Sequence, residues 1–152
     1  MNEIRAFRGE YFYLSNFFRC EFEVAGLGNV RSAEHAYNAF KTTDDVSRRW
    51  VLEAETPAEA KRRGRSLGLS DDWLTGGRVN AMLTVVAHKF SDPVLQARLR
   101  DTGNAVLIEG NTHHDDFWGD CTCGGSDCGD PGRNMLGEIL MATRTRLRID
   151  RG

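Results

Sequence analysis

The chain has 152 residues, of which 40% are hydrophobic and 28% charged, a composition typical of a folded globular protein rather than a disordered one. A chain of this length most often forms one domain and buries enough surface to fold without a metal ion or disulfide bonds. Its net charge of −2 argues against a protein that coats DNA without sequence preference, but leaves open an enzyme that contacts nucleic acid locally.

No apolar run is long enough to cross a membrane, and the first residues lack the apolar core of a secretory signal peptide. We therefore expect a cytoplasmic protein with no membrane partner. In that compartment the four cysteines are expected to be thiols or metal ligands rather than disulfides.

The first thirty residues are rich in aromatic side chains, with six between Phe7 and Phe18. Short strands are predicted at 22–24 and 29–31, because glycines between them favour a turn. A helix is predicted to follow, with Ser32 as its N-cap and an apolar stripe at helical spacing up to Phe40.

Three further helices are predicted in the middle of the chain. The first begins at a capping box between Thr56 and Glu59, with Pro57 in its first turn, and ends near residue 67. The second covers 78–90 and is expected to turn five apolar side chains inward: Val79, Met82, Leu83, Val86 and Phe90. A short helix capped by 91–93 ends near residue 102.

The last third of the chain is predicted to contain a buried strand at 105–109, a long loop at 110–133 and a helix capped by Asn134. Together these elements predict an α+β fold of a single domain, residues 1–152, mainly helical with a small β-sheet. We expect that sheet to combine the aromatic N-terminal segment with the strand at 105–109.

Polar side chains follow one face of the helix after Ser32. Glu34, Asn38 and Lys41 are four and seven residues apart, which places them on the same side of a helix. A carboxylate, an amide and an amine beside Tyr37 would suit acid–base or nucleophilic chemistry. The alternative is an ordinary solvated helix face.

The loop at 110–133 contains two acids followed by two aromatic residues, Asp115-Asp116-Phe117-Trp118. Such a group could provide a wall for a flat ring with a carboxylate beside it, since loops on a rigid scaffold often carry function. Alternatively, the loop is simply anchored by a buried tryptophan.

Basic side chains gather on the helix that starts at Pro57, where Lys61 and Arg65 share a face. They could hold phosphate groups, or they could form the solvated side of an amphipathic helix.

Cys121, Cys123 and Cys128 lie close together in the same loop. Zinc bound at such a site would need a fourth ligand, for which Cys20, His113 and His114 are candidates. Free thiols and a redox disulfide are the alternatives. We expect the core to fold without this loop, because the rest of the chain supplies enough apolar residues.

Several segments together resemble the NADAR family, also called YbiA-like, in order and over nearly the whole chain. The matching segments are 14–17, 32–37 with 40–41, 60–61 with 64–65, Arg78 with Met82 and 89–90, 109–111, 116–119, and Gly132, Asn134, 136–137 with 140–141. The cysteine cluster is outside this set, so the resemblance implies nothing about it.

The resemblance implies an N-glycosidase that cleaves the bond between a ribose C1 and a nitrogen. Of the substrates associated with the family, we expect ADP-ribose on guanine in nucleic acid, with transient DNA contact. The alternatives are phosphoribosylamino-pyrimidine intermediates of riboflavin synthesis, or a non-catalytic module that binds ADP-ribose or a nucleotide. No cofactor or metal is expected to be needed.

The resemblance, taken with the chemistry, also implies roles for individual residues. Cleavage develops positive charge at C1, which a carboxylate stabilises. We expect Glu34 to supply it, and Lys41, which shares its face, to be a better nucleophile than Lys89. The catalytic set is therefore Glu34, Lys41 and Asp116. The expected substrate-binding residues are Asn16, Phe17, Tyr37, Asn38, Lys61, Arg65, Lys89, Asn111, Trp118 and Asn134.

Overall fold

In a computed structural model that describes residues 2–128 and 130–151, the chain forms two compact units. The middle unit is the continuous segment Asn16–Asp92, and the terminal unit combines Met1–Ser15 with Pro93–Gly152. Met1, Gly129 and Gly152 belong to the predicted domain, and Gly129 also to the predicted loop, but they lie outside the described residues. The assignment of residues 1–152 to one domain stays a prediction.

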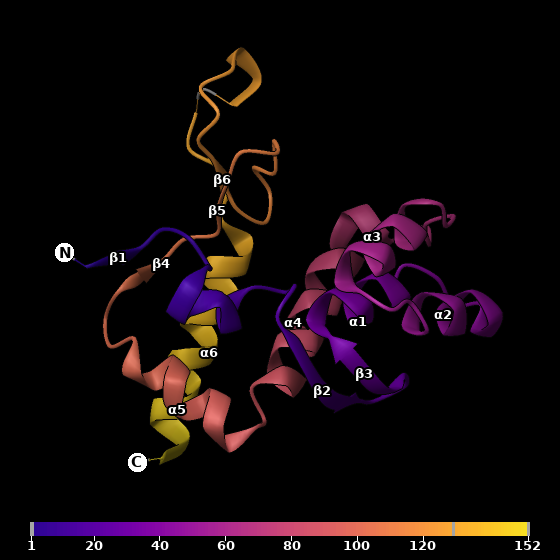
Figure 1. Cartoon of the computed structure of the whole chain (residues 1–152), viewed down its shortest axis with the longest axis horizontal. Helices are drawn as coiled ribbons and strands as arrows, with labels where there is room; N and C mark the ends of the chain where they lie inside the picture. The colour runs from indigo at the N-terminus through magenta and orange to yellow at the C-terminus, as the bar shows by residue number, and fades with distance from the viewer. Residues whose placement is uncertain (1, 129, 152) are drawn as a thin grey trace. The chain divides into compact units, whose positions relative to one another are not determined.

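The middle unit begins with a β-hairpin, as predicted. Strand β2 (Arg19–Val24) pairs antiparallel with β3 (Gly28–Ser32), and a register irregularity lies between Arg19 and Phe22 (Figure 1). Gly26 and Gly28 have φ values of 87° and 81°, a backbone region that glycine enters without steric cost. These two residues allow the tight turn between the strands.

Helix α1 (Ala33–Ala39) is the centre of the middle unit. Its N-cap is Ser32, as predicted, whose hydroxyl accepts a hydrogen bond from the His35 N–H at 3.1 Å. The helix contacts β3 and three other helices, α2 (Asp45–Leu52), α3 (Pro57–Arg65) and α4 (Arg78–Lys89). Because neighbours surround it, every residue of α1 is buried.

The other helices of the middle unit agree with the sequence patterns in part. At α3, Thr56 caps the Glu59 N–H as predicted, but the helix ends at Arg65, before residue 67. Helix α4 is confirmed, yet Leu83 is 46% exposed, so its predicted inward position is wrong. The helical phase explains this error, since Ala81 and Val85 occupy the buried face instead.

Two elements of the middle unit had no counterpart in the sequence prediction. Helix α2 begins after Asp44, whose carboxylate caps the Ser47 N–H at 2.9 Å. A π-helical turn, η2 (Trp73–Gly77), precedes α4 and includes Gly76 at φ 149°. Small side chains fill the core between the helices. One cluster contains Val24, Val30, Ala33, Ala36 and Val85, and another contains Ala39, Val51, Ala54 and Ala60.

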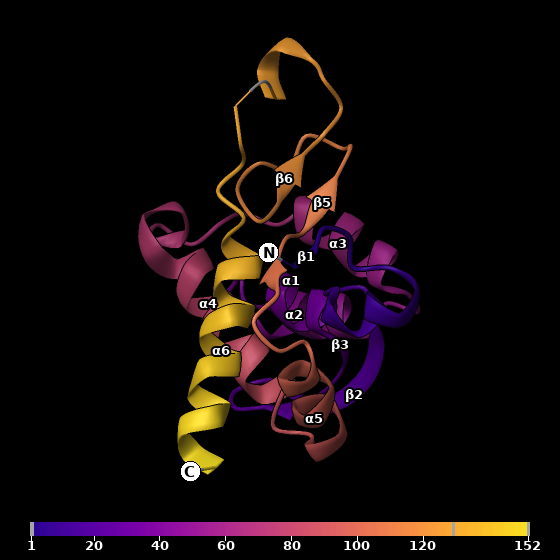
Figure 2. The ribbon, with the colours of Figure 1, turned by 90° about the vertical axis from the view of Figure 1, so that its left-hand side faces the viewer.

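The terminal unit contains the remaining elements. These are β1 (Glu3–Ile4), the 3-10 helix η1 (Gly9–Leu14), α5 (Pro93–Asp101), β4 (Val106–Leu107), β5 (Gly110–Asn111), β6 (Asp120–Cys121), the 3-10 turn η3 (Ser126–Cys128) and α6 (Met135–Arg151). Helix α6 contacts α5 and β4, and β4 pairs in parallel with β1. Figure 2 shows β5 and β6, which also pair in parallel, beyond the N-terminal end of α6.

The α+β class is confirmed, but across residues 2–128 and 130–151 the predicted small sheet is replaced by three separate two-stranded pairs. The aromatic segment forms η1 instead of a strand, and Glu3–Ile4 pairs with the shortened 106–107 strand in its place. Within the described residues, none of the helices combines the length and the apolar character needed to cross a bilayer.

Candidate active site

The polar face of α1 is not solvated, so the alternative of an ordinary exposed face is wrong. Glu34 is 8% exposed and Asn38 is 1% exposed. The Asn38 amide donates to the Glu34 backbone carbonyl at 2.8 Å and to its carboxylate at 3.3 Å. A buried carboxylate held by a neighbouring amide is an arrangement found where a protein uses the carboxylate chemically.

The Lys41 amine lies just beyond the end of α1, partly buried, 5.6 Å from the centre of the Tyr37 ring. Burial lowers the pKa of Lys41. The nearby Glu34 carboxylate raises this pKa, and the neighbouring cations Arg65 and Lys61 lower it. Tyr37 packs in turn on Trp73, with ring centres 5.3 Å apart. The sequence analysis did not identify Trp73, because it lies in a π-helical turn with no regular apolar spacing.

Helix α3 brings two cations toward this group. The Lys61 amine lies 5.7 Å from the centre of the Phe17 ring, and Arg65 is exposed one turn further along. Close packing between α3 and α1 depends on Gly64, since a Cβ there would overlap the Asn38 side chain. Glycine at this position therefore lets Asn38 stay in place beside Glu34.

The segment before the hairpin is also tied to α1. The Glu34 N–H donates to the Asn16 carbonyl at 3.0 Å, and the Asn16 amide lies 3.5 Å from the Met82 sulfur. Asn16, Phe17, Tyr37, Asn38, Lys61 and Arg65 thus belong with Glu34 and Lys41 to one unit.

Lys89 is a second lysine with a perturbed amine. It is 1% exposed, and its amine lies 5.8 Å and 5.4 Å from the ring centres of Phe18 and Phe90. Burial lowers the pKa of Lys89 to about 8, against an opposing interaction with Cys20. The Glu34 carboxylate raises the pKa of Lys41, and Cys20 acts in the same direction on Lys89.

Asn111, Asp116, Trp118 and Asn134 lie in the terminal unit, where three of their side chains hold the loop together. Asn111 donates to the Asp115 carbonyl at 2.8 Å and accepts from the Asp115 N–H at 3.1 Å. Asp116 accepts from the Cys121 N–H at 2.8 Å. Trp118 meets Phe117 edge to face, with ring centres 4.8 Å apart.

Helix α6 begins after Asn134, as predicted, and the Asn134 carbonyl accepts from the Glu138 N–H at 2.9 Å. The side chain of Asn134 does not cap the helix, which corrects that part of the prediction. Its amide donates to the Leu107 carbonyl at 2.8 Å, and its oxygen accepts from the Glu109 N–H at 2.9 Å. With φ at 52°, the backbone turns this side chain toward the β4 segment instead of the first turn of α6.

The three clustered cysteines converge with one histidine in the terminal unit. Among the described residues, the Sγ atoms of Cys121, Cys123 and Cys128 and a ring nitrogen of His114 lie within 4.8 Å of one another. Of the three candidates for a fourth ligand, the grouping therefore contains His114 and neither Cys20 nor His113. None of the four cysteines forms a disulfide in the part of the chain that the structure describes.

The profile of the NADAR domain matches residues 5–148 of the chain. The chain is also similar to the N-glycosidase YbiA of Escherichia coli, with 32% identity over 145 residues that cover 93% of this chain and 85% of YbiA. The solution structure of E. coli YbiA superposes with a TM-score of 0.82 and 28% identity, covering 98% of this chain and 85% of that one.

A riboflavin biosynthesis protein of Vibrio vulnificus is 38% identical over 139 residues, or 90% of this chain. The chain spans only 35% of the length of that protein. The profile match and the YbiA relatives place the chain in the NADAR family. It is accordingly an enzyme of the N-glycosyl hydrolase class.

Proposed function

We propose that the chain hydrolyses the bond between C1 of a phosphorylated ribose and the nitrogen of a base, with ADP-ribose on guanine in nucleic acid as the first substrate to test. The observation that carries this proposal is the buried Glu34 carboxylate, which is 8% exposed and held by Asn38 at 3.3 Å. Its charge raises the pKa of Lys41, while the cations Arg65 and Lys61 lower it. A carboxylate and a tunable amine suit the reacting carbon, and the two further cations suit phosphate oxygens.

In the proposed reaction the C1–N bond breaks and its electron pair leaves with the base nitrogen, which takes up a proton. The Glu34 carboxylate stabilises the positive charge that develops at C1, as carboxylates do in other glycosidases. Asn38 keeps the carboxylate oriented and is a positioning residue in this scheme. Its 1% exposure favours that role over direct contact with substrate.

Lys41 is proposed to add as a neutral amine to C1 once the base has left, which forms a C1–N bond to the lysine. The bond between C1 and the ring oxygen then breaks, the oxygen takes up the proton that the amine loses, and the opened sugar is held as a Schiff base. Water hydrolyses the Schiff base, which releases the phosphorylated sugar and returns the amine. The lowered pKa of Lys41 supports this role, because a lysine must lose its proton before it can attack. Within the middle unit, Phe17 is proposed to contact the base or ribose, while Asn16 and Lys89 support the groups around them. The roles expected for Asn111, Asp116, Trp118 and Asn134 of the terminal unit stay predictions.

The alternative substrate is a phosphoribosylamino-pyrimidine. It is favoured by the similarity to a protein named for riboflavin biosynthesis, although the chain matches about a third of that protein. Both substrates present the same ribose C1–N bond, so the proposed chemistry does not distinguish them.

One experiment tests the proposal and separates the substrates. The purified chain is incubated in parallel with ADP-ribosylated guanine DNA and with the ribosylamino-pyrimidine, and released sugar is measured by mass spectrometry. Release of ADP-ribose from DNA is the expected result. Release from the pyrimidine alone would replace the substrate and keep the chemistry, and release from neither would overturn the proposal.

A further inference from the structure

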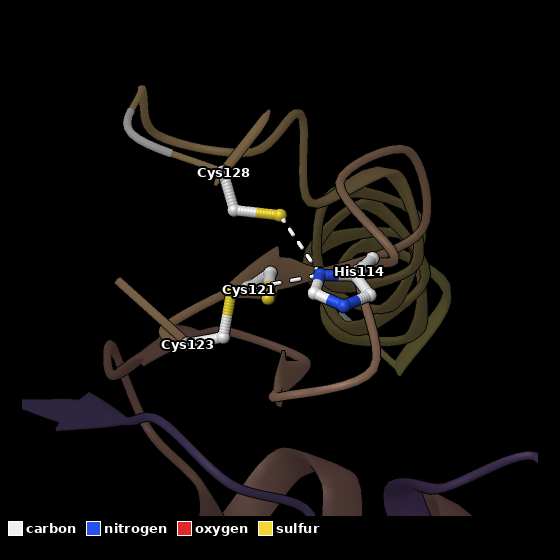
Figure 3. A group of neighbouring side chains, drawn as sticks. All are labelled: His114, Cys121, Cys123 and Cys128. Atoms are coloured by element: carbon white, nitrogen blue, oxygen red, sulfur yellow. Dashed lines mark hydrogen bonds between the residues drawn. The ribbon is translucent and has the colours of Figure 1, made fainter. Parts of the chain in front are cut away.

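The strongest unassigned feature is the group of three cysteines and one histidine, called here the Cys3His cluster: His114, Cys121, Cys123 and Cys128. Their side chains come from three places in the terminal unit, the segment after β5, the end of β6 with the residues following it, and η3. Figure 3 shows the three sulfurs facing the imidazole of His114. The cluster belongs to the terminal unit, whereas Glu34, Lys41, Lys61 and Arg65 belong to the middle unit.

The separations match a tetrahedral metal site. His114 Nδ1 lies 3.3 Å from the Cys128 Sγ and 3.5 Å from the Cys123 Sγ. With Zn–S bonds of ~2.3 Å and Zn–N bonds of ~2.0 Å, tetrahedral zinc sets neighbouring sulfur and nitrogen ligands ~3.5 Å apart and two sulfurs ~3.8 Å apart. The widest separation in the cluster, 4.8 Å or less, closes to that distance by a shift of about 1 Å.

The backbone around the cluster also suits bound thiolates. The Gly125 N–H donates to the Cys123 Sγ at 3.4 Å, a contact that stabilises a thiolate and orients it toward a metal. Gly124, at φ 77°, makes the turn that allows this contact. Cys121 is fixed by the β5–β6 pairing, in which it stands opposite Asn111.

The loop that carries Cys123 and Cys128 buries little apolar surface, so the hydrophobic effect contributes little to its stability. Of the residues from Thr122 to Arg133 that the structure describes, Cys128 alone is buried. Most of the others are exposed glycine or polar residues. A metal ion bound by four side chains supplies the free energy that such a loop otherwise lacks.

We propose that the Cys3His cluster is a structural zinc site, in which Cys121, Cys123 and Cys128 bind as thiolates and His114 binds through Nδ1. The three thiols release their protons to solvent as the metal binds. Four protein ligands complete the coordination of the ion and leave no position for water or substrate, so the site has a structural role and takes no part in glycoside cleavage.

The test is the zinc content of the chain purified under reducing conditions and then loaded with one equivalent of zinc. We expect about one zinc per chain after desalting, and loss of most of it in Cys123→Ser and Cys128→Ser. Cys20→Ser and His113→Ala are the matched controls, since neither residue belongs to the cluster, and both should keep the metal. Cobalt substitution should give the visible bands of a tetrahedral thiolate site in wild type and not in Cys123→Ser.

Cys123 is exposed, so its serine variant is expected to fold even where the variant at the buried Cys128 does not. Three results would overturn the proposal. They are no zinc retained by the loaded wild type, equal zinc in wild type and Cys123→Ser, or an intact mass showing a disulfide within the cluster in the reduced preparation. His114→Ala is expected to weaken zinc binding and to remove nitrogen ligation from the cobalt spectrum.

Discussion

The Asn38 side-chain amide donates a hydrogen bond to the Glu34 carboxylate, with Nδ2 and Oε2 3.3 Å apart. The two residues are one helical turn apart on α1, and both are buried. Asn38 is itself confined by Gly64 of α3. The position of the carboxylate is therefore set by packing between two helices.

We predict that Gly64→Ala lowers activity without unfolding the chain. The added methyl group overlaps Asn38 and displaces the amide that holds Glu34, so kcat should fall about tenfold or more, equal to ~1.4 kcal/mol. Overpacking should also cost about 1–3 kcal/mol of unfolding free energy. Gly68→Ala is the control, because a Cβ there meets nothing within 4 Å, and equal kcat in the two variants would contradict the prediction.

We predict that Glu34→Gln keeps the fold and loses most N-glycosidase activity. Glutamine has the same shape and can still accept from Asn38, but it carries no charge to stabilise C1, so kcat should fall ~10²–10⁴-fold. The measurement is steady-state kinetics on the substrate identified above, with the exposed Glu53→Gln as control. Near-wild-type kcat in Glu34→Gln would show that another group acts on C1.

Borohydride added during turnover is predicted to trap a sugar on Lys41. Reduction of a Schiff base gives a stable secondary amine, which peptide mass spectrometry assigns to its residue. The adduct should be absent in Lys41→Ala and present in Lys89→Ala. Absence of any adduct in wild type, with activity retained in Lys41→Arg, would instead leave Lys41 as a phosphate contact.

Lys89 is predicted to make stability depend on pH. Its pKa falls from 10.5 to about 8 on folding because of burial, so between these values the unfolded chain binds more protons than the folded chain. The unfolding free energy should therefore rise with pH across this window, while the burial penalty is fully present below pH 8. Lys89→Met should remove this dependence and stabilise the chain at pH 7 by up to roughly 3 kcal/mol.

Urea unfolding of wild type and Lys89→Met between pH 7 and 10.5 measures this effect, because other titrating groups cancel in the difference. The two stability curves should converge as pH rises. Curves that stay parallel over the whole range would mean that Lys89 has the same proton affinity in both states.

Asn134→Ala is predicted to destabilise the terminal unit. The substitution leaves the Leu107 carbonyl and the Glu109 N–H without their side-chain partner, at a cost of about 1–3 kcal/mol, and alanine is less tolerant of φ 52°. Asn134→Gly, which accepts that φ, separates the two contributions. Unchanged urea stability with a raised KM would instead support direct contact of Asn134 with substrate.

Local patterns predicted much of the helical structure, and long-range packing accounts for what they missed. The Ser32 cap and the stripe to Phe40 predicted α1, since both depend on residues within one or two turns. The burial of Glu34 could not be predicted in the same way, because α1 packs against α3 and α4, which come later in the chain. Spacing on a helix shows which residues share a face and not what packs against that face.

The same limit applies to the loops. Sequence spacing identified three close cysteines, but the choice of His114 over His113 depends on the path of the loop and on His114 at φ 69°. Asn134 matched the pattern of a helix cap, and its actual partners are 25 and 27 residues away. A local pattern does not specify partners at that distance.

The division of the chain also sets an order in which its parts can complete their contacts during synthesis. The Asn16–Asp92 segment is continuous, so α1 has its neighbours α2, α3 and α4 as soon as residue 92 has left the ribosome. Strand β1 must wait until β4 is made, because Glu3 pairs with Val106. At about 5–20 residues per second, α1–α4 have time to assemble first, since helices form in microseconds. Strand β1 is thus made well before β4 and is among the last elements to find its partner.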